Sequence, residues 1–175
     1  GELVCKKAFP SMPVYFWNDK NGKKFFDAYF NKFKNVWHHG DFIEINNYGG
    51  VKIFGRSDAT LNPGGIRIGT AEIYRVVDRF DAVNDSLVIG QSINDDERVI
   101  LFIIISNGYK FSNKLVHDIK KTIFKECSPR HVPEIILEAK DIPYTINGKK
   151  VEIAVKKVIN GEIVENKDAL KNPEA

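Results

Sequence analysis

The sequence GRSDATLNPGGIRIG, residues 55–69, separates two halves of the chain that follow different patterns. It holds four glycines and one proline in fifteen residues, and its apolar positions repeat with neither the strand period nor the helix period. Such a stretch does not form a regular element. We therefore predict a hinge and loop at residues 56–69, between residues 1–55 and a second domain at residues 70–162, followed by a polar, loosely ordered tail at residues 163–175.

The residues before this loop predict short strands joined by turns. Strand-like composition marks residues 2–5, 13–17, 40–46 and 50–55. Asn47-Tyr48-Gly49-Gly50 predicts a hairpin turn between the last two, since asparagine and glycine tolerate turn conformations. The Phe- and Lys-rich residues 23–34 suit either a short helix or a loop. This half is too small for an independent β-rich domain, so we expect it to be the end of a larger one.

The residues after the loop alternate between helical and strand patterns, which predicts an α+β domain with a small mixed sheet flanked by helices. Strands are expected at residues 86–91, 98–106 and 133–139, and the second is apolar on both faces, as a central strand is. Three helices follow from apolar stripes. The stripes are Ile73, Val76, Val77 and Phe80; Leu115, Ile119 and Ile123; and Val151, Ala154, Val155 and Val158, the last closed by Asn160-Gly161.

Composition narrows the class of protein. A chain of 175 residues with 43% hydrophobic residues can build a core, and no apolar run reaches the roughly 20 residues of a membrane helix. No signal-peptide pattern opens the sequence, and without an initiator methionine we expect the chain to begin inside a longer protein. Cys5 and Cys127 lie far apart, so we expect a soluble protein of the reducing cytosol. The net charge of +3 favours no partner.

Residues 36–41, VWHHGD, place Asp41 after two adjacent histidines. A zinc site is not expected from His38 and His39, because neighbours on a strand point to opposite faces. A carboxylate at the end of a strand, with no adjacent cation, suits hydrogen bonding to the hydroxyls of a nucleotide sugar. An ordinary turn carboxylate is the alternative, and the local sequence alone favours it.

Two arginines, Arg56 and Arg67, lie in glycine-rich surroundings. A guanidinium on a pliant backbone can reach phosphate or ribose oxygens, although a solvated loop would have the same composition. Neither G-x-G-x-x-G nor the P-loop motif occurs. If the protein binds a nucleotide, its main phosphate loop lies elsewhere.

Residues 142–150, IPYTINGKK, put Lys149 directly after Asn147-Gly148. Asn-Gly favours a tight turn. Lys149 is then either a solvated charge beside the turn or an ammonium that the turn delivers to an anionic substrate.

Taken in order, GELVC, WHHGD, GRSDATLNPGGIRIGTAEI and PYTINGKK resemble the C-terminal part of the adenylate-forming acyl-CoA synthetases, the superfamily of firefly luciferase and peptide-synthetase adenylation domains. FPSMPVYFWND and NGKKVEIAVKK, the latter in place of SGKIMRR, favour the branch that activates acetoacetate. The alternative within the family is another short acid such as acetate or propionate. The resemblance implies an ATP-dependent, AMP-forming ligase that makes an acyl-adenylate and then passes the acyl group to coenzyme A.

The resemblance also implies roles for residues of the matching motifs. Asp41 and Arg56 are similar to the residues that hold the AMP ribose, and Arg67 is similar to the arginine that contacts the nucleotide phosphate. Lys149 resembles the catalytic lysine of adenylation.

Two further positions concern the hinge and coenzyme A. Asp58 resembles the residue about which the small C-terminal domain rotates, and Gly65 resembles the glycine that lines the pantetheine tunnel. The residues that bind the coenzyme A 3′-phosphate do not follow from a motif; Lys121, Lys125 and Arg130 are candidates.

Other parts of the family pattern are missing from this sequence. The phosphate loop, the adenine pocket and the acyl pocket belong to an upstream large N-terminal domain, which also holds most of the ATP–Mg site. Residues 1–55 would be the end of that domain. We therefore expect a fragment that is inactive by itself.

A rival prediction is a small basic module that binds nucleic acid through Lys23, Lys24, Lys32 and Lys34, interleaved with Phe and Tyr. The 26 Lys and Arg residues are nearly balanced by 23 Asp and Glu residues, and no nucleic-acid-binding motif is present. We therefore expect no nucleic-acid partner, and no membrane partner.

Overall fold

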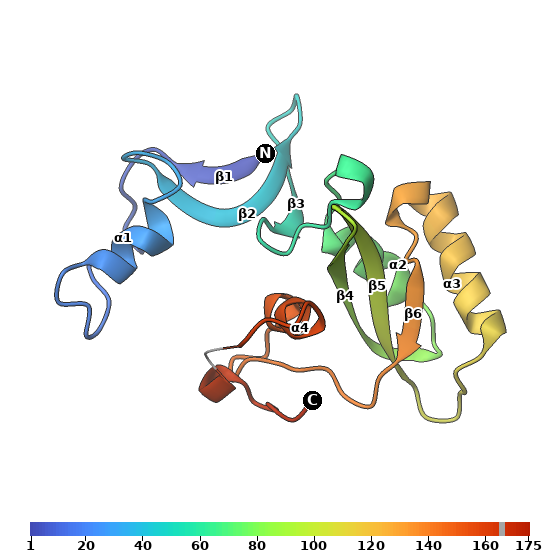
Figure 1. Ribbon diagram of the computed structural model, residues 1–175. Helices are drawn as coiled ribbons and strands as arrows, with labels where there is room; N and C mark the ends of the chain where they lie inside the picture. Colours follow the sequence, from blue (N-terminus) through green and yellow to red (C-terminus); the bar gives the residue numbers. More distant parts are fainter. Residues whose placement is uncertain (165–166) are drawn as a thin grey trace. The chain divides into compact units, whose positions relative to one another are not determined.

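The computed structural model describes residues 1–164 and 167–175, which divide into two units, Gly1–Asp58 and Ala59–Ala175 (Figure 1). Each unit has its own three-stranded sheet. The assignment of residues 56–69 as a hinge stays a prediction.

The sheet of the first unit has the strand order β1-β2-β3 and is antiparallel throughout. Its strands are β1 (Glu2–Cys5), β2 (Trp37–Ile45) and β3 (Val51–Arg56). The predicted hairpin turn between β2 and β3 is confirmed, and Asn46 closes it because its side-chain oxygen accepts hydrogen bonds from the N–H groups of Tyr48 and Gly50.

The predicted strand at residues 13–17 is wrong. A strand needs pairing partners and buries alternate side chains, but this segment forms no strand and Trp17 is 90% exposed. Only Phe16 packs inward, edge-on against Phe25 and Tyr29 of α1 (Lys23–Tyr29). Aromatic content suggested a strand, whereas one aromatic side chain, Phe16, packs on a short helix and Tyr15 and Trp17 are exposed. Of residues 23–34, the first seven form that helix.

The sheet of the second unit has the order β4-β5-β6, with β4 (Val83–Ile93) antiparallel and β6 (Ile135–Glu138) parallel to the central β5 (Asp96–Ile105). Both the mixed sheet and the central place of β5 confirm the sequence prediction. Alternate residues of β5 enter two separate cores, because successive side chains of a strand point to opposite faces. Val99, Leu101 and Ile103 lie in one core and Ile100 in the other.

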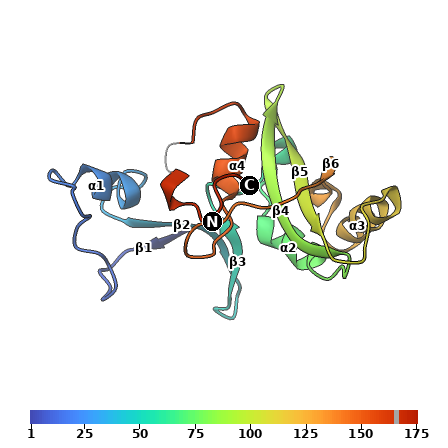
Figure 2. The same cartoon turned by 90° about the horizontal axis from the view of Figure 1, so that it is seen from below.

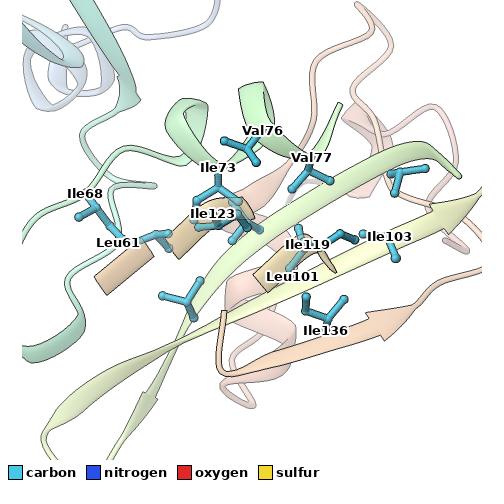
Figure 3. Packing of buried hydrophobic residues seen from close by; sticks show 13 residues of the cluster. Leu61, Ile68, Ile73, Val76, Val77, Leu101, Ile103, Ile119, Ile123 and Ile136 are labelled. Carbon is cyan, nitrogen blue, oxygen red and sulfur yellow. The ribbon is translucent and has the colours of Figure 1, made fainter. Parts of the chain in front are cut away.

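Helices cover both faces of this sheet, and Figures 1 and 2 show α4 on the opposite side from α2 and α3. The larger core joins β5 to the stripes of α2 (Thr70–Val77) and α3 (Asn113–Glu126), as Figure 3 shows. The smaller core lies against α4 (Glu152–Ile159).

Two details of the helices differ from the expected stripes. Helix α2 ends at Val77, so Phe80 packs against the core from the following turn. In α4, Val158 is 61% exposed and Ile159 packs on the smaller core instead. The reason is that Val155 and Ile159, four residues apart, share the face that meets the sheet.

Part of the predicted tail differs from the loose segment that was expected, while its residues 165 and 166 lie outside the described residues. Residues 167–175 begin with a 3-10 turn at Lys167–Ala169, and residues 169–172 hydrogen-bond to residues 141–146. The polar composition suggested a loose segment, but residues 169–172 are held by hydrogen bonds of their backbone and of one asparagine side chain. No helix in the described part of the chain is long and apolar enough to cross a membrane.

Ile123→Ala should lower the free energy of unfolding by about 2–5 kcal/mol, because it removes a side chain with 0% exposure from the larger core. Urea denaturation followed by far-ultraviolet circular dichroism measures it. Both tryptophans, Trp17 and Trp37, lie in the first unit. Tryptophan fluorescence would therefore follow the first unit and not the second, which contains Ile123. The matched control is Ile163→Ala, at 83% exposure. Equal losses in the two variants would contradict this description of the core.

Candidate active site

The Lys149 turn is a short hairpin closed by Thr145. The Gly148 N–H donates to the carbonyl of Thr145 at 2.8 Å, and the Thr145 N–H donates to the carbonyl of Lys149 at 2.8 Å. The Thr145 hydroxyl accepts from the Lys149 N–H at 3.0 Å. Only Gly148 needs the left-handed conformation, with a φ of 74°. The backbone that carries Lys149 is thus fixed by three hydrogen bonds to one residue.

The two lysines at the end of this turn have different surroundings. Lys149 is exposed. The partly buried Lys150 ammonium lies 2.8 Å from Asp85 Oδ1, donates to the carbonyl of Ser86, and lies 4.5 Å from the centre of the Tyr74 ring. Lys150 therefore fastens the turn to β4, while Lys149 is presented to solvent.

Asp85 and two tyrosines complete the support. Tyr144 donates its hydroxyl proton to Asp85, and Tyr74 donates to Glu152 while accepting from the Val88 N–H at 3.1 Å. Burial alone would raise the pKa of Asp85, but hydrogen bonds from Lys150 and Tyr144 hold it below its ordinary value. Burial, with the nearby Glu152, raises the pKa of Tyr74. Tyr74 thus keeps its proton and remains a donor.

The sequence analysis did not identify this network, and the only local signal was the charged Asp85 just before the predicted strand at residues 86–91. Its side chains also occupy the free edge of β4, where the N–H of Val88, the carbonyl of Ser86 and the N–H of Ser92 would otherwise lack strand partners. Their partners are Tyr74, Lys150 and Asn160. These contacts reduce the number of backbone groups that the edge of β4 offers to another strand.

The loop that carries Gly65 is held by the hairpin between β4 and β5. The N–H groups of Asn62 and Gly64 each donate at 2.7 Å, to Glu97 Oε1 and Asp96 Oδ1 respectively. Backbone hydrogen bonds from Glu97 and Gly64 hold the pKa of Asp96 below its ordinary value. Gly65 has a φ of 77° and no atom within 4 Å of the position of a Cβ, so its side of the loop is open.

Arg130 is the candidate for the 3′-phosphate that the structure brings to this loop. Its guanidinium covers Gly64, where a Cβ would lie 2.3 Å from Nη1. The other two candidates, Lys121 and Lys125, belong to α3. Arg67 is exposed, beside the pairing of Leu61 with Ile68.

Asp41, Arg56 and Asp58 lie together in the first unit. Arg56 donates two hydrogen bonds to Asp58, from Nε at 3.2 Å and from Nη2 at 3.1 Å, and its pKa is raised chiefly by this contact. Its guanidinium lies over Gly40, where a Cβ would be 2.9 Å away. Arg56, Asp58 and His39 line part of a cleft of about 680 Å³ in this unit.

The surroundings of Asp41 differ from the sequence expectation. Asp41 lies within β2, paired in register with Arg56, and not at the end of a strand. His39 Nδ1 lies 2.7 Å from its carboxylate, so Asp41 has a hydrogen-bonding neighbour. His38 instead contacts Glu2 at 3.1 Å. The two histidines therefore serve different carboxylates, and the described residues contain no cluster of three metal-ligating side chains.

Burial would raise the pKa of Glu2, but hydrogen bonds from Lys32, Ser57 and His38 hold it at about 2. Glu2 thereby ties β1 to the residue after β3. Lys32 is thus engaged within the first unit and is not free for a polyanion.

The small mixed sheet of the second unit, with helices on both faces, matches the C-terminal domain of adenylate-forming enzymes. The comparisons give the particular family. The chain is 56% identical over 175 residues to acetoacetyl-coenzyme A synthetase of Rhizobium meliloti (strain 1021), covering 100% of this chain and 27% of the relative. It is 53% identical over 176 residues to acetoacetyl-CoA synthetase of Gallus gallus, covering 99% and 26%.

The solved acetoacetyl-CoA synthetase from Streptomyces lividans matches with a TM-score of 0.92 and 39% identity, over 99% of this chain and 26% of that one. No protein-family model matches the chain. The chain belongs to the acetoacetyl-CoA synthetases, as their C-terminal portion, and spans about a quarter of the length of these relatives. The comparisons do not support the nucleic-acid-binding alternative.

Asp85→Asn should lower the free energy of unfolding at pH 7. In acid the variant and the unchanged protein should differ less in stability. Because the pKa of Asp85 is lowered from 3.8 on folding, its contribution is complete above that pH and is lost as pH falls through the lower folded value. Urea midpoints between pH 7 and pH 2, followed by circular dichroism, measure this.

The control for Asp85→Asn is Asp81→Asn, which changes an exposed carboxylate in the same unit. It should shift the midpoint little at any pH. A gap between Asp85→Asn and the unchanged protein that stays constant with pH would contradict the role of the Asp85 charge.

Proposed function

We propose that the complete protein is an ATP-dependent, AMP-forming ligase that converts acetoacetate to acetoacetyl-CoA in the cytosol, feeding lipid and sterol synthesis. The observation that carries this proposal is the similarity of the whole chain to acetoacetyl-CoA synthetases, at 56% and 53% identity. The acid is the substrate of those relatives by name. Acetate or propionate remains the alternative substrate, since the acid pocket belongs to the large N-terminal domain.

Lys149 is proposed to act in adenylation. A carboxylate oxygen of the acid forms a bond to the α-phosphorus of ATP while the bond to the pyrophosphate oxygen breaks. Negative charge grows on the phosphoryl oxygens and on the leaving pyrophosphate. An ammonium stabilises this charge most when it is already in place. The exposure of Lys149 and the three hydrogen bonds that hold its backbone support the role.

Asp41 and Arg56 are proposed to bind the hydroxyls of the AMP ribose, and Arg67 the nucleotide phosphate. Asp58 is proposed as the hinge about which residues 59–175 rotate between the two half-reactions. The contact between Arg56 and Asp58 supports this pairing of roles, because it links the ribose site to the hinge. Magnesium would accompany ATP at the large domain, and this chain's residues are assigned no part in holding it.

Gly65 is proposed to line the path of the coenzyme A thiol. In this second step the thiolate sulfur bonds to the acyl carbon, the carbon–oxygen bond to the phosphate breaks, and AMP leaves. The open space beside Gly65 supports this role, and Arg130 on the neighbouring Gly64 supplies a cation for a phosphate of coenzyme A.

Lys149→Ala in the complete enzyme should lower adenylation by ~10²- to 10³-fold, as the loss of one transition-state contact does, while sparing thioester formation from supplied acetoacetyl-adenylate. Acetoacetate-dependent exchange of pyrophosphate into ATP measures the first step. Lys110→Ala, at another exposed lysine of the same unit, should leave both steps intact. Running the exchange with acetate and propionate identifies the acid. Equal losses in both half-reactions would refute the role of Lys149.

Gly65→Ala should slow thioester formation at least ~10-fold and leave adenylation nearly unchanged, because a methyl group narrows the path of the thiol. The control is Gly108→Ala: both glycines have positive φ, and neither has an atom within 4 Å of its Cβ position. The two substitutions thus impose similar backbone strain. If Gly108→Ala slowed thioester formation as much, strain and not the thiol path would explain the effect.

A further inference from the structure

The C-terminal tail is bonded to the segment that leads to Lys149. Asn172 makes three of these contacts: its side-chain oxygen accepts from the Tyr144 N–H at 2.8 Å, and its amide nitrogen donates to Asp141 Oδ2 at 2.7 Å and to the carbonyl of Ile142 at 2.9 Å. One asparagine therefore spans the residues at which the chain enters the turn.

Backbone contacts extend this attachment. The Lys171 N–H donates to the carbonyl of Tyr144 at 2.8 Å, and the Ile146 N–H donates to the carbonyl of Ala169 at 3.1 Å. Thr145, which closes the Lys149 turn, is paired in register with Leu170. The segment from Tyr144 to Ile146 thus has the Lys149 strand of the turn on one side and the tail on the other.

This segment depends on such partners because it belongs to no regular element. Residues 139–143 form neither helix nor strand, and Tyr144 and Thr145 form only isolated pairings. Its other attachments are the Ile142 side chain in the smaller core, the hydroxyl of Tyr144 on Asp85 and the contacts of Lys150 with β4, none of which holds the side that faces the tail. Without the tail, the backbone that fixes Thr145, and through it Lys149, would be held from one side only.

We propose that residues 169–172, with Asn172 at their centre, position the Lys149 turn for adenylation. This inference rests on the proposed catalytic role of Lys149. Asn172 acts through the backbone of Tyr144 and Ile142, so it is a positioning residue and not a catalytic one. A flexible lysine stem tolerates small errors, but displacement of its backbone by about 1 Å can cost up to ~10²-fold in rate.

The test uses the complete enzyme. Asn172→Ala should lower the kcat of acetoacetate-dependent pyrophosphate exchange by ~10- to 10²-fold with little change in the KM for ATP. Thioester formation from supplied acetoacetyl-adenylate should be unchanged. Asn113→Ala, which changes an exposed asparagine at the start of α3, should leave both steps intact.

A second set of variants separates positioning from loss of folding. Asn172→Asp keeps the size of the side chain but sets a carboxylate against Asp141, so adenylation should fall. The double variant with Asp141→Asn restores that hydrogen bond in the reverse direction but not the one to the Ile142 carbonyl, so it should recover part of the loss. If the double variant recovered no adenylation activity, the hydrogen bond between residues 141 and 172 would have no part in positioning the turn.

Combination with Lys149→Ala decides the mechanism. If Asn172 acts through Lys149, Asn172→Ala should cause no further loss in the Lys149→Ala enzyme. A further ~10-fold loss there, or equal loss in both half-reactions, would overturn the proposal. An unaffected Asn172→Ala enzyme beside a disabled Lys149→Ala enzyme would overturn positioning alone, whereas an unaffected Lys149→Ala enzyme would overturn the catalytic role as well.

Discussion

The contact between the Lys150 ammonium and Asp85 is the constraint on which the candidate site depends. Both side chains are partly buried, and a charge withdrawn from water is tolerated only when it is paired and hydrogen-bonded. Lys150, Tyr144 and the Ser86 carbonyl meet these needs together. Since neighbouring residues of an extended strand point to opposite sides, the inward direction of Lys150 sends Lys149 outward. The exposure of the proposed catalytic lysine is thus a consequence of the burial of the next residue.

Much of the second unit followed from the sequence because its pattern is set by burial. β5 is apolar at every position from Val99 to Ile105 and lies between two cores, and α3 has a stripe with the helix period. The prediction failed where burial depended on distant partners. At residues 13–17 only Phe16 packs on α1, and in α4 the choice of Ile159 over Val158 depends on which face the sheet presents. Periodicity identifies a stripe, but it does not say how far the stripe is rotated toward its neighbour.

The candidate site divides in the same way. The motifs pointed to Lys149 and Gly65 as candidate site residues, because a turn and a glycine loop are each formed by residues that are adjacent in sequence. Their supports came from far along the chain: Tyr144 and Asp85 are 59 residues apart, and Asn62 and Glu97 are 35 apart. Pairings at such separations leave no local pattern. The tail is the extreme case, because its polar composition suggested disorder while Asn172 makes three hydrogen bonds.

Glu97 connects the two parts of the second unit that the proposed half-reactions use. Its carboxylate accepts from Asn62 beside the glycine loop and pairs with Lys156 of α4, the helix that follows the Lys149 turn. It can do so because Gly90 has no side chain; a Cβ there would lie 1.9 Å from Glu97 Cδ. A carboxylate held between two donors and a backbone resists displacement, so movement of the loop relative to α4 would break an ion pair and a hydrogen bond together. It follows that a change between the proposed adenylation and thioester-forming steps would cost least if it turned this unit as one body about the proposed hinge and left its interior unchanged.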